Sequence, residues 1–169
     1  ILAATDLSDN SRAALRSAAR LAERRNTPLE ILYCEELGDP EAPWRAFVST
    51  PWEEPAKLKK RAAKKLKQFA DETLADIELT VPRKEVVGLD SIEDALVERE
   101  ERGDLDCIVV GATGRGQLAR LLLGTTAEAI VRRATSPVCA VPPQRALDQA
   151  RTILAPVDLS DCSRASLQL

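Results

Sequence analysis

The sequence predicts an α/β fold, a three-layer sandwich in which helices cover both faces of a five-stranded parallel sheet. Short apolar runs alternate along the chain with segments of helical periodicity. One of these runs, LDCIVVGA at 105–112, is apolar almost throughout, as expected of a strand that is covered on both faces. Right-handed crossovers, together with a proline that confines the third strand to an edge, favour the strand order 3-2-1-4-5.

The first strand and helix are predicted within residues 1–25. The apolar run ILAAT (1–5) is a strand that ends at Asp6. The segment 11–25 follows as a helix, for which Ser8 or Asn10 provides the N-cap. Its apolar face comprises Ala14, Leu15, Ala18, Leu21 and Ala22.

The second strand and helix are separated by an irregular segment. PLEILYC (28–34) is the strand, and residues 36–55 contain four prolines and both tryptophans. A helix is predicted over 56–74, and its basic run KLKKRAAKKLK (57–67) is interpreted as a solvated face rather than a nucleic-acid patch, because no aromatic residues are interleaved with it. The inward residues of this helix are Leu58, Ala62, Leu66, Phe69 and Ala70.

Three more strands and two more helices complete the pattern. IELTVPRKEVVG (77–88) is the third strand, with Pro82 marking it as an edge strand. Ser91, followed by Asp94 three residues later, begins a helix over 91–102. After the fourth strand, a glycine-rich stretch leads into a helix that runs to about Ala134, and SPVCAVP (136–142) is the last strand.

Composition excludes several classes of function. The chain has 169 residues, no histidine and a net charge of −3, which disfavours metal-dependent hydrolysis and nucleic-acid binding. No run of about 18 apolar residues and no leader sequence is visible, so we expect a cytoplasmic protein without a membrane span. Because methionine is absent, we expect the natural start to be missing. The four cysteines are Cys34, Cys107, Cys139 and Cys162, and the first three lie in apolar, strand-like runs. We expect these to be small buried hydrophobes with free thiols in a reducing cytosol.

The stretch GATGRGQLARLLLGTT (111–126) fits three nucleotide-binding patterns unequally. Gly111 and Gly116 have the spacing of a phosphate loop, but Gln117 replaces the lysine that this motif requires. A dinucleotide fingerprint traced through Gly114, Gly116 and Ala119 follows the wrong strand and has no acidic residue for a ribose. The third pattern is G-x-x-G, nine residues, then G-[ST], formed by Gly111, Gly114, Gly124 and Thr125.

With this spacing after the fourth strand, the chain closely resembles the nucleotide-binding type of the universal stress protein family. ILAATDLSD at the front and SPVCAVP at the back resemble the opening and closing strands of that family, over residues 1 to about 143. The resemblance implies a Rossmann-like fold of the adenine nucleotide alpha hydrolase type and ATP as the ligand, with or without Mg²⁺. It also implies a nucleotide-responsive stress or signalling role. Because histidine and the phosphate-loop lysine are absent, we predict no catalytic or metal-binding residues and expect any ATP hydrolysis to be slow.

The proposed ligand contacts follow from the chemistry of these residues. Glycines at the end of the fourth strand let main-chain amides approach phosphate or ribose, and the helix that Gly124 opens favours an anion. Asp6 would repel phosphate and is therefore expected at the nucleoside end, while the resemblance implies main-chain recognition of adenine at about Glu35. The candidate nucleotide-binding residues are Thr5, Asp6, Glu35, Gly111, Gly114, Arg115, Gly116, Gly124, Thr125 and Thr126.

Structural explanations compete with each of these assignments. Thr125 and Glu128 have the spacing of a capping box, Gly114 and Gly116 suit a tight turn, and Asp6 could cap the first helix. The alternative function is an interaction module of the same fold that dimerises without nucleotide. An adenylating enzyme is disfavoured, because its serine- and glycine-rich loop is replaced by TDLSDNS, which contains no glycine.

The end of the chain repeats its beginning. Residues 1–17 align without gaps with residues 153–169, and 11 of the 17 pairs are identical. We therefore expect a domain at 1–143, a linker at 144–152 and the start of a second, truncated copy at 153–169. The resemblance further implies pairing through the last strand, either between two chains or between tandem copies.

Overall fold

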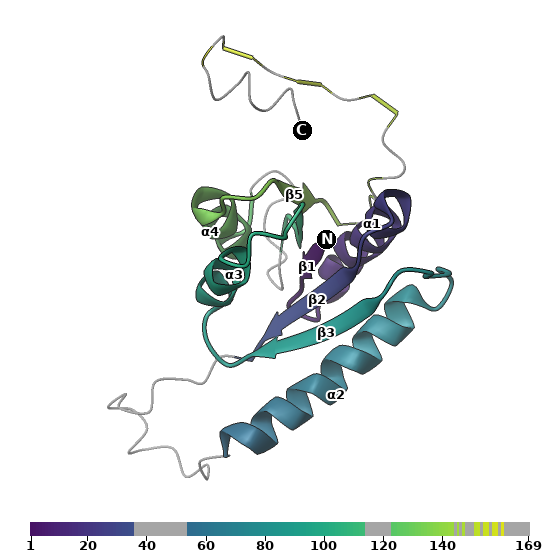
Figure 1. The fold of residues 1–169 in the computed structure, drawn as a ribbon, viewed down its shortest axis with the longest axis vertical. Helices are drawn as coiled ribbons and strands as arrows, with labels where there is room; N and C mark the ends of the chain where they lie inside the picture. The colour runs from purple at the N-terminus through teal and green to yellow at the C-terminus, as the bar shows by residue number, and fades with distance from the viewer. Residues whose placement is uncertain are drawn as a thin grey trace.

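Five parallel strands form the sheet in the order β3-β2-β1-β4-β5 (Figure 1), which confirms the predicted order. The structure, a computed structural model, describes residues 1–35, 54–113, 123–143, 145, 147, 151–152, 154–155, 157–158 and 160. The strands are β1 (Leu2–Ala4), β2 (Leu29–Cys34), β3 (Arg83–Gly88), β4 (Ile108–Gly111) and β5 (Val138–Val141). Cys162 and the predicted irregular segment, except for Glu54 and Pro55, lie outside the described residues.

Helices cover both faces of the sheet, as predicted. α1 (Asp9–Arg25) and α2 (Pro55–Leu74) lie on one face, and α3 (Ile92–Glu100) and α4 (Thr125–Arg133) lie on the other (Figure 1). Alternate residues of one strand serve the two faces, since Ile31 packs in the α1 and α2 cluster whereas Leu32 packs in the α3 and α4 cluster. Burial of each such side chain stabilises the fold by about 1.5–3 kcal/mol.

The third strand is shorter than predicted, and the prediction that it begins near residue 77 is wrong. β3 begins at Arg83, directly after Pro82, which has no amide proton for a sheet. The amides of Thr80 and Val81 instead donate to the Glu23 carboxylate at the end of α1, at 2.6 and 3.0 Å. Other predicted elements differ from the observed ones by only a few residues at their ends.

The predicted helix faces and caps are largely confirmed. All five inward residues predicted for α2 are buried, and the seven basic side chains between 57 and 67 are exposed. Ser91 is the N-cap of α3, where its hydroxyl accepts a hydrogen bond from the Asp94 amide at 3.1 Å. Ser8 is at the N-cap position of α1, but its side chain makes no capping hydrogen bond to the helix.

The cysteines of the described region are free thiols. Cys34, Cys107 and Cys139 are only partly buried, so the expectation of buried hydrophobes holds in part. Burial raises the pKa of Cys107 and of Cys139, which keeps both thiols protonated near neutral pH. Among the described helices, none is both long and apolar enough to cross a membrane.

An ion pair joins α1 to Asp76, two residues after the end of α2. The Arg16 guanidinium donates to both carboxylate oxygens of Asp76, at 2.5 and 2.7 Å, and to the Thr73 carbonyl at 2.9 Å. The hydrogen bond from Arg16 lowers the pKa of Asp76 to about 2. A bidentate pair of this kind fixes the relative position of the two helices on their shared face of the sheet.

We predict that acid weakens the fold partly through Asp76. The pKa of Asp76 is depressed in the folded state. Its contribution to the free energy of unfolding is therefore complete above the ordinary pKa of about 3.9 and is lost as the pH falls through about 2. The free energy of unfolding, measured by urea titration at pH 2–5, should therefore fall less steeply with acid for Asp76→Asn than for the unaltered chain. Equal slopes for the two proteins would contradict the prediction.

Candidate functional site

The candidate site lies at the carboxyl edge of the sheet, where β1 and β4 end side by side. The register pairs Ala4 with Val110, so the residues that follow, Thr5 and Gly111, lie next to each other at this edge. A Cβ atom on Gly111 would lie 3.5 Å from the Ser11 Cα atom, so α1 begins close against this glycine. A methyl group would fit there at ordinary contact distance, but a larger side chain would meet the backbone of α1.

The loop between β1 and α1 is held by the Thr5 hydroxyl. Thr5 is 8% exposed, and its Oγ1 atom shares a hydrogen bond of 2.8 Å with the Ser11 hydroxyl. The same oxygen accepts the Leu7 amide at 3.1 Å, which stabilises a residue whose φ of 60° is unusual for a branched side chain. The side chain of Thr5 therefore shapes the site from within the protein.

Asp6 is oriented by the residue two positions later. Its Oδ1 atom accepts the Ser8 amide at 3.0 Å and the Ser8 hydroxyl at 2.6 Å, which closes an Asx turn. The alternative that Asp6 caps α1 is therefore wrong in detail, because Ser8 is at the cap position and Asp6 holds Ser8. The turn fixes a carboxylate at the edge of the sheet, directly after β1.

Two main-chain hydrogen bonds bring the beginning of α4 to the end of β4. The Ala112 amide donates to Val141 of β5 at 2.8 Å, and the Ala112 carbonyl accepts the Gly124 amide at 2.7 Å. Gly124 is the N-cap of α4, and the first bond of the helix runs from the Glu128 amide to the Gly124 carbonyl at 2.8 Å. The amides of Thr125 and Thr126 thus precede the hydrogen-bonded part of the helix, at its positive end.

The predicted capping box at the beginning of α4 is not formed. Thr125 is the first residue of the helix rather than its cap, and the helix has no side-chain cap. The Glu128 carboxylate accepts hydrogen bonds from Arg132, at 2.8 and 3.0 Å, on the exposed side of the helix. Capping therefore does not explain why threonines follow Gly124.

Glu35 lies at the same edge, directly after β2. Its amide donates to the Gly88 carbonyl of β3 at 3.1 Å, and its carboxylate accepts the Tyr33 hydroxyl at 2.6 Å and the Lys65 ammonium at 3.3 Å. The hydrogen bond from Tyr33 is the main cause of the lowered pKa of Glu35. Burial raises this pKa, whereas Lys65 lowers it further. With the amide engaged by β3, the main-chain group of Glu35 that can still meet a ligand is its carbonyl.

The edge therefore gathers most of the predicted residues. Those placed along it by the described structure are Thr5, Asp6, Glu35, Gly111, Gly124, Thr125 and Thr126. Gly114, Arg115 and Gly116 lie outside the described residues. Sequence reasoning missed the supporting roles of Ser8, Ser11, Ala112 and Lys65, although the serines following Asp6 are a sequence signal for an Asx turn.

Residues 1–142 match the model of the universal stress protein family. The chain belongs to this family. It is 31% identical over 149 residues to universal stress protein MJ0531 of Methanocaldococcus jannaschii, which covers 83% of this chain and 80% of that protein. A universal stress protein of Mycolicibacterium smegmatis is 30% identical over 172 residues, and the alignment covers 98% of this chain but only 56% of that relative.

A solved universal stress protein in complex with cAMP has the same fold. It superposes with a TM-score of 0.57 and 26% identity, over 84% of this chain and 95% of that chain. In the part of this chain that the structure describes, no three histidine, cysteine or acidic side chains gather as a metal site would require. Among the described residues, the edge offers main-chain amides, hydroxyls and two oriented carboxylates.

Proposed function

We propose that the chain binds an adenine nucleotide, with ATP as the preferred ligand, at the carboxyl edge of the sheet. The observation that carries the proposal is the hydrogen bond between Gly124 and Ala112, which places the beginning of α4 against the end of β4. Unpaired amides at a helix N-terminus favour a phosphate, and ligands of parallel α/β sheets bind at this edge. A family member solved with cAMP supports the ligand class.

The charges of the edge support one orientation of the ligand. The phosphates lie at the beginning of α4, with Thr125 and Thr126 amides as donors, and the nucleoside lies toward Asp6 and Glu35. Gly111, Gly114, Arg115 and Gly116 belong to the phosphate side of this proposal, with or without Mg²⁺ on the phosphates. Asp6 then accepts a hydrogen bond from a ribose hydroxyl or an amine, for which its Asx turn has already oriented it.

The proposed role is that of a nucleotide-responsive stress or signalling protein rather than a fast enzyme. The chain contains no histidine, and neither a lysine nor a hydroxyl residue occupies the phosphate-loop positions at 117 and 118. The edge is thus suited to hold a nucleotide and poorly suited to activate water. The proposed outcome of binding is a change in association with partners.

Analysis of the purified protein for bound nucleotide tests the proposal. We expect mass spectrometry of the material released by heat to detect an adenine nucleotide, and calorimetry to detect ATP binding by the emptied protein. Absence of nucleotide in both measurements would favour the alternative, an interaction module of the same fold without a ligand. Turnover of ATP within the 1–1000 s⁻¹ range of ordinary enzymes would contradict the assignment as a binding protein.

We also propose association through β5, the edge strand next to β4. The carbonyls of Pro137 and Val141 accept hydrogen bonds from β4, so the main-chain groups of Val138 and Ala140 point away from the sheet by the alternation of a strand. These groups can pair with the same strand of a second chain, or with that of a tandem copy.

The internal repeat supports the proposal that a second copy of the domain begins at residue 153. In the first copy the Asp6 carboxylate accepts the Ser8 amide at 3.0 Å, and 152 residues later Asp158 accepts the Ser160 amide at the same distance. The repeated sequence therefore forms the same local turn.

A further inference from the structure

The end of β2 is linked to α2 by a chain of hydrogen bonds between side chains. The Tyr33 hydroxyl, whose residue is 7% exposed, donates to the Glu35 Oε2 atom at 2.6 Å. Lys65 of α2 donates to the same oxygen at 3.3 Å and to Oε1 at 3.5 Å. The Glu35 amide is engaged on the other side by Gly88 of β3. Glu35 is therefore held by three different elements.

The partners of Glu35 place its carboxylate on the α2 side of the sheet. Tyr33 packs in the hydrophobic cluster that α1 and α2 share, and Lys65 is on α2 itself. The Glu35 side chain is 21% exposed and that of Lys65 is 47% exposed. An ion pair at such exposure contributes little to folding, so its removal should leave the fold intact.

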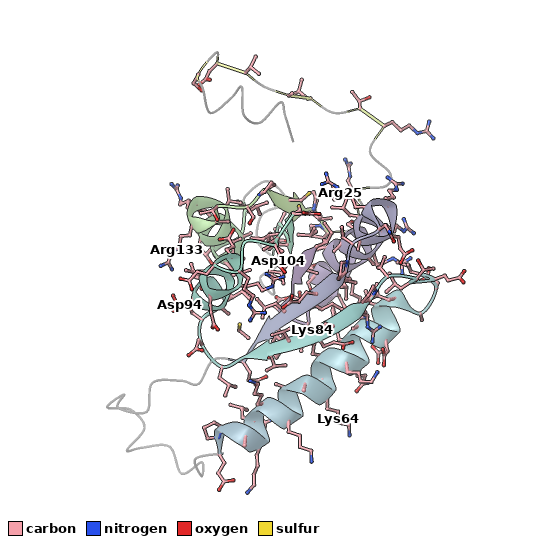
Figure 2. The ribbon with its side chains drawn as sticks, viewed as in Figure 1. Arg25, Lys64, Lys84, Asp94, Asp104 and Arg133 are labelled. Atoms are coloured by element: carbon pink, nitrogen blue, oxygen red, sulfur yellow. The ribbon has the colours of Figure 1, made fainter. Side chains whose placement is uncertain are left out.

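A free carboxylate at this position would oppose an anionic ligand. The Asp6 carboxylate already lies at the same edge, and each further negative charge lowers the affinity for phosphate. Lys65 offsets the charge of Glu35 and keeps the carboxylate turned toward α2. The neighbouring Lys64 is also exposed on α2, but it forms no ion pair with any described residue and points away from the sheet (Figure 2).

We propose that Lys65 is a positioning residue of the nucleotide site, which holds and neutralises Glu35 so that the edge accepts an anionic nucleotide. This inference rests on the proposed function. It assigns no ligand contact to Lys65, whose effect on binding passes through Glu35. Replacement of Lys65 should therefore matter only while Glu35 carries its charge.

A double-mutant cycle tests this proposal by calorimetry with ATP. At low salt we expect Lys65→Met to weaken binding about threefold to tenfold, because the unbalanced charge of Glu35 at the nucleoside end repels the anionic ligand along the same edge. Lys65→Arg should retain the affinity, and Lys64→Met is the matched control that removes a lysine without exposing Glu35. The Lys65→Met effect should shrink as salt increases. In a Glu35→Gln background, Lys65→Met should change the affinity less than twofold.

The outcomes separate this inference from the function on which it rests. If the unaltered protein binds no nucleotide, the proposed function fails and this inference fails with it. If ATP binds but Lys65→Met behaves like Lys64→Met, only the positioning role is overturned. The positioning role is also overturned if Lys65→Met lowers the ATP affinity equally with and without the Glu35 charge, because Lys65 would then contact the ligand directly. Thermal unfolding of each variant should remain close to that of the unaltered protein.

Discussion

Gly124→Asp should strengthen the fold and abolish nucleotide binding, so that one substitution moves stability and affinity in opposite directions. Gly124 is at the N-cap of α4 with φ −63° and ψ 152°, a conformation that any residue adopts without strain. Aspartate is among the best N-cap residues and its charge suits the helix dipole, which together should stabilise the protein by about 0.5–1 kcal/mol. The same carboxylate would occupy the place where we propose that phosphate binds.

The loss of affinity should be at least about thirtyfold, the effect of about 2 kcal/mol of repulsion between a carboxylate and a polyphosphate. Calorimetry with ATP measures the affinity, and urea titration measures the stability. Gly124→Asn is the matched control, because asparagine caps a helix as well as aspartate does but carries no charge. If the aspartate variant binds ATP as tightly as the asparagine variant, phosphate does not bind at the beginning of α4.

Most of the fold was predictable because its elements carry strong local signals. Ser91 with Asp94 marks the beginning of α3, and the apolar run around Val109 marks a strand buried on both faces. The failure at β3 has a local cause, since the sequence shows Pro82 but does not show that Glu23, some 57 residues earlier, binds the preceding amides. A contact between residues so distant in sequence produces no periodic pattern from which it could be predicted.

The sequence predicts that several candidate residues meet at one edge of the sheet, but it does not predict the contacts that support them. Glycine spacing and the topology of a parallel sheet identify the edge where Asp6, Gly111 and Gly124 gather. The alternative of a capping box at Thr125 was wrong because a matching spacing does not specify the register of a helix end, and α4 begins one residue earlier than that box requires. The role of Lys65 could not be predicted, because its position beside Glu35 depends on how α2 crosses the sheet.

The charges at the carboxyl edge show why both the sequence and the structure are needed to judge the candidate site. From the sequence alone, Asp6 is expected to repel phosphate, and Glu35 adds a second acidic side chain at the same edge. In the structure each carboxylate is already engaged, Asp6 by Ser8 and Glu35 by Tyr33 and Lys65. Repulsion of the ligand by these two carboxylates is therefore a weaker argument against binding once their partners are known. The part that Lys65 offsets can be measured as its effect on the affinity for ATP.

Ala140→Pro should prevent association of the protein through β5. The Ala140 amide points away from β4, so proline removes a donor from the outer edge while the bonds of Pro137 and Val141 to β4 persist. The added ring also keeps another strand from approaching. Loss of two or three strand hydrogen bonds, each contributing about 1 kcal/mol, should weaken association at least about thirtyfold in sedimentation equilibrium.

The control for this experiment is Ala140→Thr, which keeps the amide and suits a strand, and which should associate as the unaltered protein does. Both variants should unfold within about 1 kcal/mol of the unaltered protein, because the altered group serves no bond inside the sheet. A monomeric unaltered protein at high concentration would contradict pairing between chains, and pairing would then require a tandem copy. An Ala140→Pro variant that associates as strongly as Ala140→Thr would show that the contact is elsewhere on the surface, because a contact through β5 would lose the Ala140 donor and meet the proline ring.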